Sequence, residues 1–544
     1  MSPSIEEAEI YDVIIVGAGP CGLATAARLR EHAPDALFTD EEHRRYSWIG
    51  KYGGKVSLKH VRSGKKTLAK ATRRPEYKLA VLDATSGSWM GRWKELFAKF
   101  EIAHLRSHML WHVDPLDRDA LLAHAYRTGR QDELLEMRHC VGREISKHGK
   151  KKQKATGPRA YGGKQTGRVK INLRDRNDYW NPSLSLFVDH CQDVVDRYNL
   201  DDDLVHKEAV RDIDYGVVRG VSAGDEKLFT VTTDNECRYA KIVVMAVGPA
   251  NKPVIPRAPS MPQDGAIPQA CHSMDMNEFP ASIVQQRMAA GRPTNVLIVG
   301  GGLTSAQLSD LAVRRGVTKV WHIMRGQLRV KYFDVDLDWM GKYKNAEHSR
   351  FWTADSDEER LEIINEARGG GSFNFVYHKK IKKHVASGKV ELREETKLRD
   401  AALEEVDGET KWTVETEPPI ENLPRMDYIY FATGVKTDFT TLPYLQTILR
   451  KYPLKGYGGF PCLTEDLMWK DDVPLFLTGR LAALQLGPAA PNIGGAKLGA
   501  ERIAWAIEDR IKPSGAEEWE AGQGQGLGGY LSGHGNMYSA LVCE

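Results

Sequence analysis

A run of apolar residues leads directly into three spaced glycines near the start of the 544-residue sequence. The segment DVIIVGAGPCGLATAARL, residues 12–29, predicts a strand, a tight turn and a helix in that order. Gly17 permits the turn, Gly19 lets the backbone approach phosphate oxygens, and Gly22 allows close packing of the helix on the strand. The N-terminus of the expected helix, at Pro20, carries partial positive charge and free N–H groups that suit an anion. The segment therefore predicts a site for the pyrophosphate of a dinucleotide.

A second segment, NVLIVGGGLTSAQLSDL at residues 295–311, repeats this order of strand, turn and helix. Gly300, Gly302 and Ser305 take the three positions of the small residues, and Thr304 precedes the serine. A single GxGxxG pattern arises often by chance, whereas two strand-led copies in one chain are far more specific. We therefore expect the chain to bind two dinucleotides.

The charged residue that ends the next strand predicts which dinucleotide each loop binds. A carboxylate at that place accepts hydrogen bonds from ribose hydroxyls, and a cation favours a 2′-phosphate. After the first loop we expect a strand at ALFT, 36–39, ending at Asp40 with Glu41 behind it, which favours FAD or NAD. After the second loop the strand KVWHIM ends at Arg325, which favours NADP.

Composition excludes several classes of protein. With 41% hydrophobic and 27% charged residues, a net charge of +3 and no apolar run near the ~20 residues of a membrane span, we expect a cytoplasmic protein without a membrane partner. The seven cysteines form no CxxC pair, so the sequence predicts neither a redox dithiol nor a disulfide framework. His108 and His112 are four residues apart but lack further ligands, so we expect no metal site.

Two further apolar segments end in small residues. YIYFATGVKTD, 428–438, predicts a strand closing on Thr433 and Gly434, and IVVMAVGPANKPVIP, 242–256, is a looser version. With these segments the chain resembles, from about residue 10 to about 510, the flavoproteins that bind two dinucleotides. The resemblance implies an α/β fold of two Rossmann-like domains, with the NADPH-binding domain inserted into a discontinuous FAD-binding domain. The expected boundaries are 1–255 and 416–510 for FAD, 290–415 for NADPH, and 511–544 for a glycine-rich tail.

Within that superfamily the chain is most similar to the class B flavin-dependent monooxygenases, nearest the branch that N-hydroxylates ornithine or lysine. The similarity is carried by GAGPCGLA, FATGV, GSW at 87–89 and CHSMDM at 271–276. It implies that Trp89 lies near the isoalloxazine, and that a helix beginning near Asn492 points its N-terminus at the flavin. The implied flavin contacts in the C-terminal part are Gly479, Gln485, Asn492 and Gly494, and the residues suggested to line the substrate pocket are Trp111 and His112.

The resemblance implies that NADPH reduces FAD, that dioxygen forms a peroxyflavin, and that a small amine or amino acid is hydroxylated on nitrogen. The cofactors perform the difficult chemistry, so no catalytic side chain is assigned. Lack of a CxxC pair argues against a disulfide reductase. Sulfur oxygenation, Baeyer–Villiger oxygenation, simple NAD(P)H oxidation and a flavin-bearing binding or sensing protein stay open as alternatives, as does a homo-oligomer.

Other patterns are expected to be structural. GVSAG at 220–224 lies between two strands, so Ser222 is expected in a turn and not in a nucleophile elbow. Gly369 to Gly371 predict a helix stop, and the basic segments 51–78 and 147–170 are expected to be solvated loops without a nucleic-acid partner. For the segment 328–352 we expect one of three roles: it folds over the nicotinamide, it helps to shape the substrate entrance, or it serves packing. Cys21 either has a lowered pKa or is simply small enough for the loop.

Overall fold

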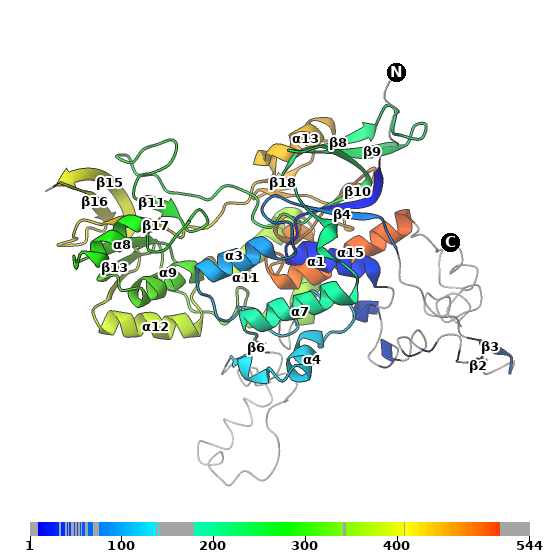
Figure 1. Cartoon of the computed structure of the whole chain (residues 1–544), viewed down its shortest axis with the longest axis horizontal. Coiled ribbons are helices and arrows are strands. Elements are labelled where there is room, and N and C mark those ends of the chain that lie inside the picture. Colours follow the sequence, from blue (N-terminus) through cyan, green and yellow to red (C-terminus); the bar gives the residue numbers. More distant parts are fainter. Residues whose placement is uncertain are drawn as a thin grey trace, which may run out of the picture.

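Two largely parallel sheets, one for each glycine loop, organise the chain (Figure 1). The computed structural model describes residues 9–31, 34–37, 76–137, 179–340, 344–406 and 408–511, with Cys140 and short stretches between 41 and 68. The first sheet has the order β20-β21-β10-β1-β4-β7, and β8 and β9 extend it beyond β10. Its strands are β1 (Ile10–Val16), β4 (Leu79–Asp83), β7 (Val205–Lys207), β8 (Val210–Val217), β9 (Lys227–Thr233), β10 (Cys237–Met245), β20 (Met468–Lys470) and β21 (Val473–Leu477).

The second sheet is wholly parallel and has the order β11-β17-β12-β13-β14. Its strands are β11 (Ala270–His272), β12 (Asn295–Val299), β13 (Lys319–Ile323), β14 (Val390–Arg393) and β17 (Tyr428–Phe431). Because β11 and β17 pair on one side of β12, this sheet draws on residues from 270 to 431, beyond the 290–415 expected from the sequence.

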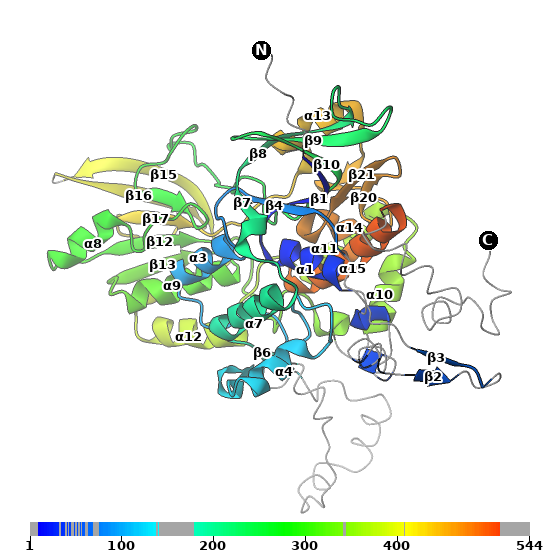
Figure 2. The same ribbon diagram turned by 45° about the vertical axis from the view of Figure 1, so that its right-hand side comes forward.

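Helices cover these sheets (Figures 1 and 2). In the first unit, α1 (Pro20–Arg30) packs against both α15 (Ile493–Arg510) and α7 (Leu184–Arg197). In the second unit, α9 (Leu303–Arg314) and α12 (Phe375–Ala386) lie on one side of the sheet, and the hairpin β15 (Lys397–Val406) and β16 (Glu409–Glu417) lies on the other. The other helices are α3 (Gly91–Lys99), α4 (Ala120–Arg127), α8 (Ser282–Ala289), α10 (Lys344–Trp352), α11 (Asp357–Arg368), α13 (Gln446–Lys451) and α14 (Ala483–Leu486).

Three further two-stranded pairs are short. They are β2 (Ser57–Lys59) with β3 (Lys66–Leu68), β5 (Leu135–Glu136) with β6 (Trp180–Asn181), and β18 (Gly456–Tyr457) with β19 (Phe460–Pro461).

The central strand of each sheet is buried because other elements cover the sheet on both faces. Residues 13–15 of β1 are fully buried, as expected for a parallel strand between two layers. In the second sheet, alternate residues of β12 face different partners: Val296 and Ile298 pack with α9, and Leu297 packs with the β15–β16 hairpin. The two apolar runs that the sequence places before the glycines are therefore the central strands of the two cores.

The strand expected at 36–39 is wrong. Ala36 and Leu37 lie in a 3₁₀ helix, Asp35–Leu37, and Asp35 accepts a hydrogen bond from Lys497 of α15 at 2.9 Å. The place beside β1 belongs instead to β4, whose buried residues LAVL pair with residues 13–16. Asp40 itself lies outside the described residues.

Two local predictions are confirmed. β8 and β9 form an antiparallel hairpin, and Ser222 Oγ accepts a hydrogen bond from the Val218 amide at 2.8 Å, so the GVSAG serine is a turn residue. Helix α11 ends at Gly369, whose φ of +60° is left-handed, as a glycine helix stop requires.

The two connections between the units lie side by side, because an isolated bridge joins Pro253 to Val435. The Val254 amide donates to the Gly434 carbonyl at 3.1 Å, and Thr433 Oγ1 donates to the Val254 carbonyl. The predicted strands ending in AVG and ATG thus lead into the two crossings. Among the helices that the structure describes, none is long and apolar enough to cross a membrane.

A buried ion pair joins α1 to α15. Arg28 Nε lies 2.7 Å from Glu501 Oε2, with side chains 1% and 8% exposed, and Arg28 also donates to the Glu31 carbonyl. We expect Arg28→Met to lower the free energy of unfolding by about 3–5 kcal/mol, because it leaves the Glu501 carboxylate buried without a partner. Urea unfolding measures this change.

The double variant Arg28→Met/Glu501→Leu should recover much of that loss, because no unpaired charge stays buried. Arg292→Ala, which removes an exposed partner of Glu409, is the control and should cost less than ~1 kcal/mol. Equal losses in the single and double variants would show that charge pairing does not hold the two helices together.

Candidate functional site

The first glycine of each loop touches the chain just beyond a neighbouring parallel strand. A Cβ on Gly17, whose φ is +112°, would lie 2.4 Å from the carbonyl oxygen of Ala246. A Cβ on Gly300 would lie at the same distance from the carbonyl oxygen of Ala432. Real Cβ atoms do not approach this closely, so only glycine fits either position. The two loops are therefore built alike, each against the residue that follows a crossover strand.

Both loops leave the N-terminus of a helix open. Helix α1 follows Gly19 and α9 follows Gly302, and neither glycine supplies a side-chain cap. A Cβ on Gly19 would meet no atom within 4 Å, so there is free space beside the loop. Uncapped backbone N–H groups next to free space suit an anion. At the second loop, a Cβ on Gly302 would meet only the Cα of Gly371, at 3.9 Å, so both loops have room for the pyrophosphate of a dinucleotide.

The predicted residues around these glycines differ in what they do. Pro20 begins α1, and a Cβ on Gly22 would lie 2.0 Å from the Gly17 carbonyl oxygen, so this position packs the helix on the turn. Ser305 Oγ donates to the Gly302 carbonyl at 2.7 Å and so closes the second loop. Thr304 is half-buried in the first turn of α9.

Asp83, which the sequence analysis missed, ends β4 beside the first loop. Its Oδ2 accepts a hydrogen bond from the Ala18 amide at 3.1 Å, and its Oδ1 accepts from Thr85 and Ser86. Burial raises the pKa of Asp83, but these hydrogen bonds outweigh it and hold the pKa below its ordinary value. Asp83 is thus the acidic residue ending the strand next to the loop, the place at which a dinucleotide's ribose is bound. The sequence signal for Asp83 was an acidic residue at the end of the apolar run LAVLD.

His322, also missed, supports the second loop from β13. Its Nε2 lies 2.8 Å from the buried Gly300 carbonyl, and its Nδ1 lies 3.0 Å from Ser309 Oγ. Because a carbonyl only accepts, Nε2 carries the proton, and the single hydroxyl proton of Ser309 lies between Nδ1 and the Ser305 carbonyl, each 3.0 Å from Oγ. Arg325 follows two residues after the strand and is exposed, where a nucleotide phosphate could reach it.

The GSW segment is attached to the first loop. The Met90 amide donates to the Ala18 carbonyl at 2.8 Å, and Trp89 Nε1 donates to the Leu200 carbonyl at 2.7 Å. Trp89 is only 3% exposed, so its ring belongs to the core under the loop. Glu41 is exposed, and its contact with a ribose stays a prediction.

The C-terminal residues suggested from the sequence meet the loop that contains Trp111. Asn492 caps α15, its Oδ1 accepting from the Ile493 amide at 2.7 Å and from Ser107 Oγ at 2.9 Å. A Cβ on Gly494 would lie 2.6 Å from the Trp111 ring, so the indole packs directly on the first turn of the helix. The ring thus lies beside the first turn of α15, at its second residue.

Gly479 lies against α1. A Cβ there would be 2.9 Å from Cys21 Sγ. Burial raises the pKa of the Cys21 thiol to about 12, against a weaker opposing effect of its hydrogen bond with Thr478. The lowered pKa considered for Cys21 is therefore wrong, and the residue is an inert small side chain of the loop.

Two predicted residues have their polar groups occupied elsewhere. Gln485 Nε2 donates to the Leu463 carbonyl at 2.9 Å and its Oε1 accepts from Arg360. His112 Nε2 lies 2.8 Å from the Arg118 carbonyl, its Nδ1 accepts from the Asp114 amide, and its side chain is fully buried. Both residues thus have packing and bonding roles within the protein.

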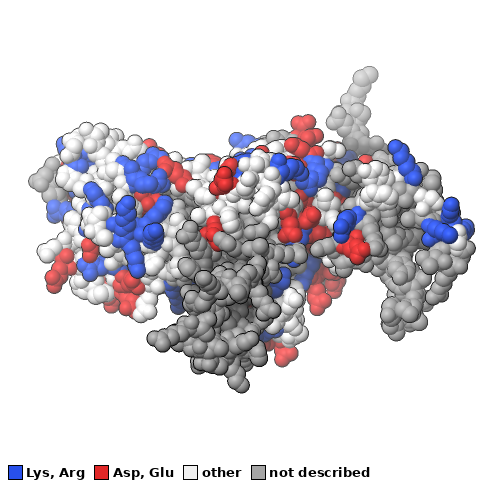
Figure 3. Space-filling view, turned by 90° about the horizontal axis from the view of Figure 1, so that it is seen from below, with Lys and Arg blue, Asp and Glu red and all other residues white. Residues whose placement is uncertain are grey.

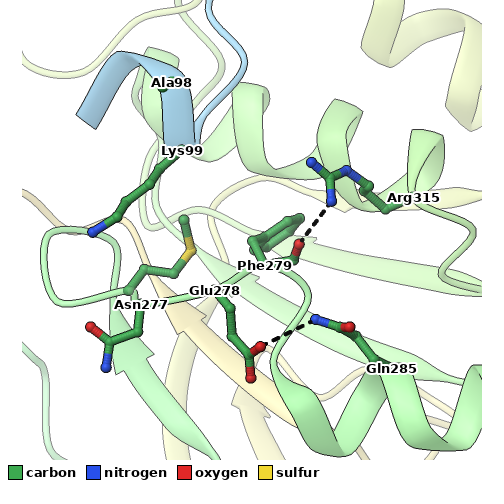
Figure 4. A pocket seen from close by; sticks show the side chains of 8 residues that line it. Ala98, Lys99, Asn277, Glu278, Phe279, Gln285 and Arg315 are labelled. Atoms are coloured by element: carbon green, nitrogen blue, oxygen red, sulfur yellow. Dashed lines mark hydrogen bonds between the residues drawn. The ribbon is translucent and has the colours of Figure 1, made fainter. Parts of the chain in front are cut away.

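A pocket of about 270 Å³ is lined by residues of both units (Figure 4). It is lined by residues at the ends of α3 and α9, by residues 276–279 and by Gln285 of α8, whose Nε2 donates to Glu278 Oε2 at 3.5 Å. Arg315 follows the C-terminus of α9, and the glycine loop lies at the opposite end of that helix, about 18 Å away for 12 residues. The pocket is therefore distant from the second glycine loop.

Among the described residues, His124, His190 and Asp193 bring potential metal-ligand atoms within 4.8 Å of one another. Asp193 is paired with both Arg127 and Arg197, and Arg127 also reaches His124 Nδ1. Guanidinium groups thus stand where a cation would bind, which makes this cluster a poor metal site.

Basic residues on the visible face of the second unit are mixed with acidic ones (Figure 3). On α12, Lys380 Nζ lies 2.8 Å from Asp310. Such mixing is typical of a solvated surface and not of a nucleic-acid interface. The basic segment 147–170 and most of 51–78 lie outside the described residues.

The two linked sheets, each with a glycine loop at the carboxyl edge of its central strand, define a fold of two Rossmann-like units. No family model and no curated protein matches the sequence. Among solved structures, the chain is similar to the ornithine N-hydroxylase of Kutzneria sp. 744, at 16% identity and a TM-score of 0.56, covering 92% of this chain and 100% of that one.

It is also similar to the ornithine hydroxylase of Pseudomonas aeruginosa, at 14% identity and a TM-score of 0.56, covering 93% of this chain and 100% of that one. The L-lysine 6-monooxygenase of Pseudomonas syringae gives 16% identity and a TM-score of 0.54 over 92% of this chain and 100% of that one. The chain therefore has the fold of the N-hydroxylating flavin monooxygenases. The predicted α/β fold class and the resemblance, as far as fold, are confirmed.

The burial of His322 as a neutral imidazole under the second loop gives a pH-dependent contribution to stability. We expect His322→Leu to lower the free energy of unfolding by about 1–3 kcal/mol at pH 7.5, because the buried Gly300 carbonyl loses its donor. Burial lowers the pKa of His322 from its ordinary 6.5 to about 4, with the hydrogen bond to Gly300 opposing this shift. Urea unfolding of wild type and of His322→Leu, repeated at several pH values, measures the free energy that His322 contributes.

Between pH 6.5 and 4, the unfolded chain binds a proton at His322 that the folded chain does not bind. The stability supplied by the neutral imidazole is therefore complete above 6.5 and is lost as the pH falls through this window. The difference between wild type and His322→Leu should shrink accordingly. A difference that stays constant from pH 7.5 to 4.5 would contradict the assignment.

Proposed function

We propose that the chain is an FAD- and NADPH-dependent monooxygenase that uses dioxygen to hydroxylate the nucleophilic nitrogen of a small amine or amino acid. The observation that carries the proposal is the pair of glycine loops with open helix N-termini in two linked units. A fold shared with N-hydroxylases of ornithine and of lysine supports this choice of reaction. On this proposal the first loop binds FAD and the second binds NADPH.

The residues of the chain bind, orient and exclude water. The amides at the start of α1 hold one pyrophosphate and those of α9 hold the other, and Asp83 fixes the first loop by accepting from the Ala18 amide. The N-terminus of α15 lends partial positive charge to the flavin ring, and Trp111, beside the first turn of that helix, excludes water. A bound flavin supplies the electron transfer and the oxygen chemistry. Of the two residues suggested for substrate contact, Trp111 is the better candidate, because His112 is bonded within its own loop.

The proposal is tested by one alanine in each loop. We expect Gly17→Ala to abolish FAD binding, because its Cβ would meet the Ala246 carbonyl. Gly300→Ala should keep FAD but lose at least a hundredfold in the rate at which NADPH reduces it without air. The two measurements are the FAD content of purified protein and the flavin absorbance after rapid mixing with NADPH.

Gly216→Ala is the matched control, because a Cβ there meets no atom within 4 Å. Reduced wild-type protein is then mixed with oxygen and with amines, thioethers or ketones. Oxygenated amine as the product supports the proposal. Turnover only with thioethers or ketones would assign a different oxygenation, and wild-type protein that binds no FAD would overturn the proposal.

The preference for NADPH is tested at Arg325. We expect Arg325→Ala to raise KM for NADPH by about 10–100-fold and to leave KM for NADH unchanged, because a charged hydrogen bond to the 2′-phosphate is worth ~1.5–3 kcal/mol. Steady-state kinetics with both nucleotides measure this. Arg292→Ala is the control, because Arg292 precedes β12 and the glycine loop follows the other end of that strand. Equal effects on both nucleotides would mean that Arg325 does not contact the 2′-phosphate.

A further inference from the structure

Arg106 joins the two units through a set of buried hydrogen bonds. It lies between α3 and α4 in the first unit, and its side chain is 8% exposed. Its guanidinium donates to the Lys331 carbonyl at 3.0 Å, to the Ser372 carbonyl at 3.1 Å and to Ser372 Oγ at 2.9 Å. It also pairs with Asp334 at 3.1 Å. One side chain thus binds two separate segments of the second unit.

Those two segments lie against the second glycine loop. They are joined to each other by a bridge between Val330 and Phe373. A Cβ on Gly371 would lie 3.0 Å from the Gly301 carbonyl oxygen and from the Gly302 backbone, so residue 371 packs directly on the loop. Ser372, which binds Arg106, is the next residue. Arg106 therefore binds the residue next to Gly371, and Gly371 is the residue that packs on the loop before α9.

The acidic partner of Arg106 reaches the N-terminus of α15. Asp334 Oδ2 accepts a hydrogen bond from Asn492 Nδ2 at 3.0 Å. Asn492 caps α15 through Oδ1, which also accepts from Ser107 Oγ. A continuous set of hydrogen bonds thus runs from Ser372, the residue after the contact with the second glycine loop, to the N-terminus of α15, which the proposed function places at the flavin.

The chemistry of these contacts requires arginine. Carbonyl, hydroxyl and carboxylate oxygens surround the guanidinium in directions that match its planar set of five N–H donors. A lysine ammonium has three donors on a point charge and cannot bond all of these acceptors at once. Burial lowers the pKa of Arg106 from its ordinary value, and the charge of Asp334 opposes this effect.

We propose that Arg106 is a positioning residue that, through Asp334 and Asn492, holds the second glycine loop in register with the N-terminus of α15. The nicotinamide and the flavin, bound in different units, then meet at a fixed distance. This inference rests on the proposed function for its consequence in turnover, but the coupling of the two sites is a property of the chain itself.

Hydrogen exchange of the protein without added nucleotide tests the coupling. In Arg106→Ala, amides in residues 300–309 and in residues 490–500 should both exchange at least tenfold faster than in wild type. Arg315→Ala is the matched control, because Arg315 also links the units, through Glu101, but at the far end of α9. It should change neither segment. Faster exchange in Arg106→Ala confined to 329–334 and 371–374 would overturn the proposal.

Flavin reduction gives the second readout. We expect Arg106→Ala to lower the limiting rate of reduction by NADPH at least tenfold, with FAD content and reduction by dithionite unchanged, and Arg106→Lys to restore only part of that rate. An unchanged limiting rate combined with a raised KM for the amine would overturn the proposal and make Arg106 a substrate ligand. If wild-type protein is not reduced by NADPH at all, the proposed function fails, and hydrogen exchange still decides the coupling.

Should Arg106→Ala not fold, Asp334→Asn and Ser372→Ala each remove one part of the set while Arg106 stays in place. Each should speed exchange in both segments severalfold. Wild-type exchange in both variants would equally overturn the proposal.

Discussion

The close approach of a glycine to a backbone carbonyl is the constraint on which both glycine loops depend. In each unit, the turn after the central strand passes so near the end of the neighbouring strand that no Cβ fits at Gly17 or Gly300. This contact exists only because the strands are parallel and in register, Val16 opposite Met245 and Val299 opposite Phe431. The strand that supplies the carbonyl is also the strand that leads out of the unit. The position of each loop is therefore tied to the path by which the chain crosses between units.

Much of this arrangement is local in sequence and could be predicted. An apolar strand, glycines at fixed spacing and a following helix lie within 18 residues, so the pattern at 12–29 carries its own structure. The same holds for the hairpin around Ser222 and the helix stop at Gly369. The two crossover strands were also predicted, because each is followed by small residues. Ala246 and Ala432 among them lie against the glycine loops.

The residues that were missed act over long distances in sequence. Asp83 lies beside the first loop only because residues 31–78 intervene between α1 and β4, whereas the expected Asp40 assumed a direct connection. His322 and Arg106 are identified by the atoms they bind, Gly300 in one case and Ser372 in the other, and no spacing rule relates these partners. Burial likewise overruled the helix-terminus argument for Cys21, since a thiolate gains little from a dipole when it is removed from water.

The order of elements along the chain also sets when each unit is able to fold. The second sheet is built from residues 270–431, so all of its strands are available once that stretch has left the ribosome. The first sheet needs β21 beside β10, and α1 needs α15 and the buried Glu501, all contributed by residues beyond 470. The second unit, in the middle of the chain, is thus able to fold during synthesis, while the N-terminal glycine loop requires α15, the last helix in the part of the chain that the structure describes.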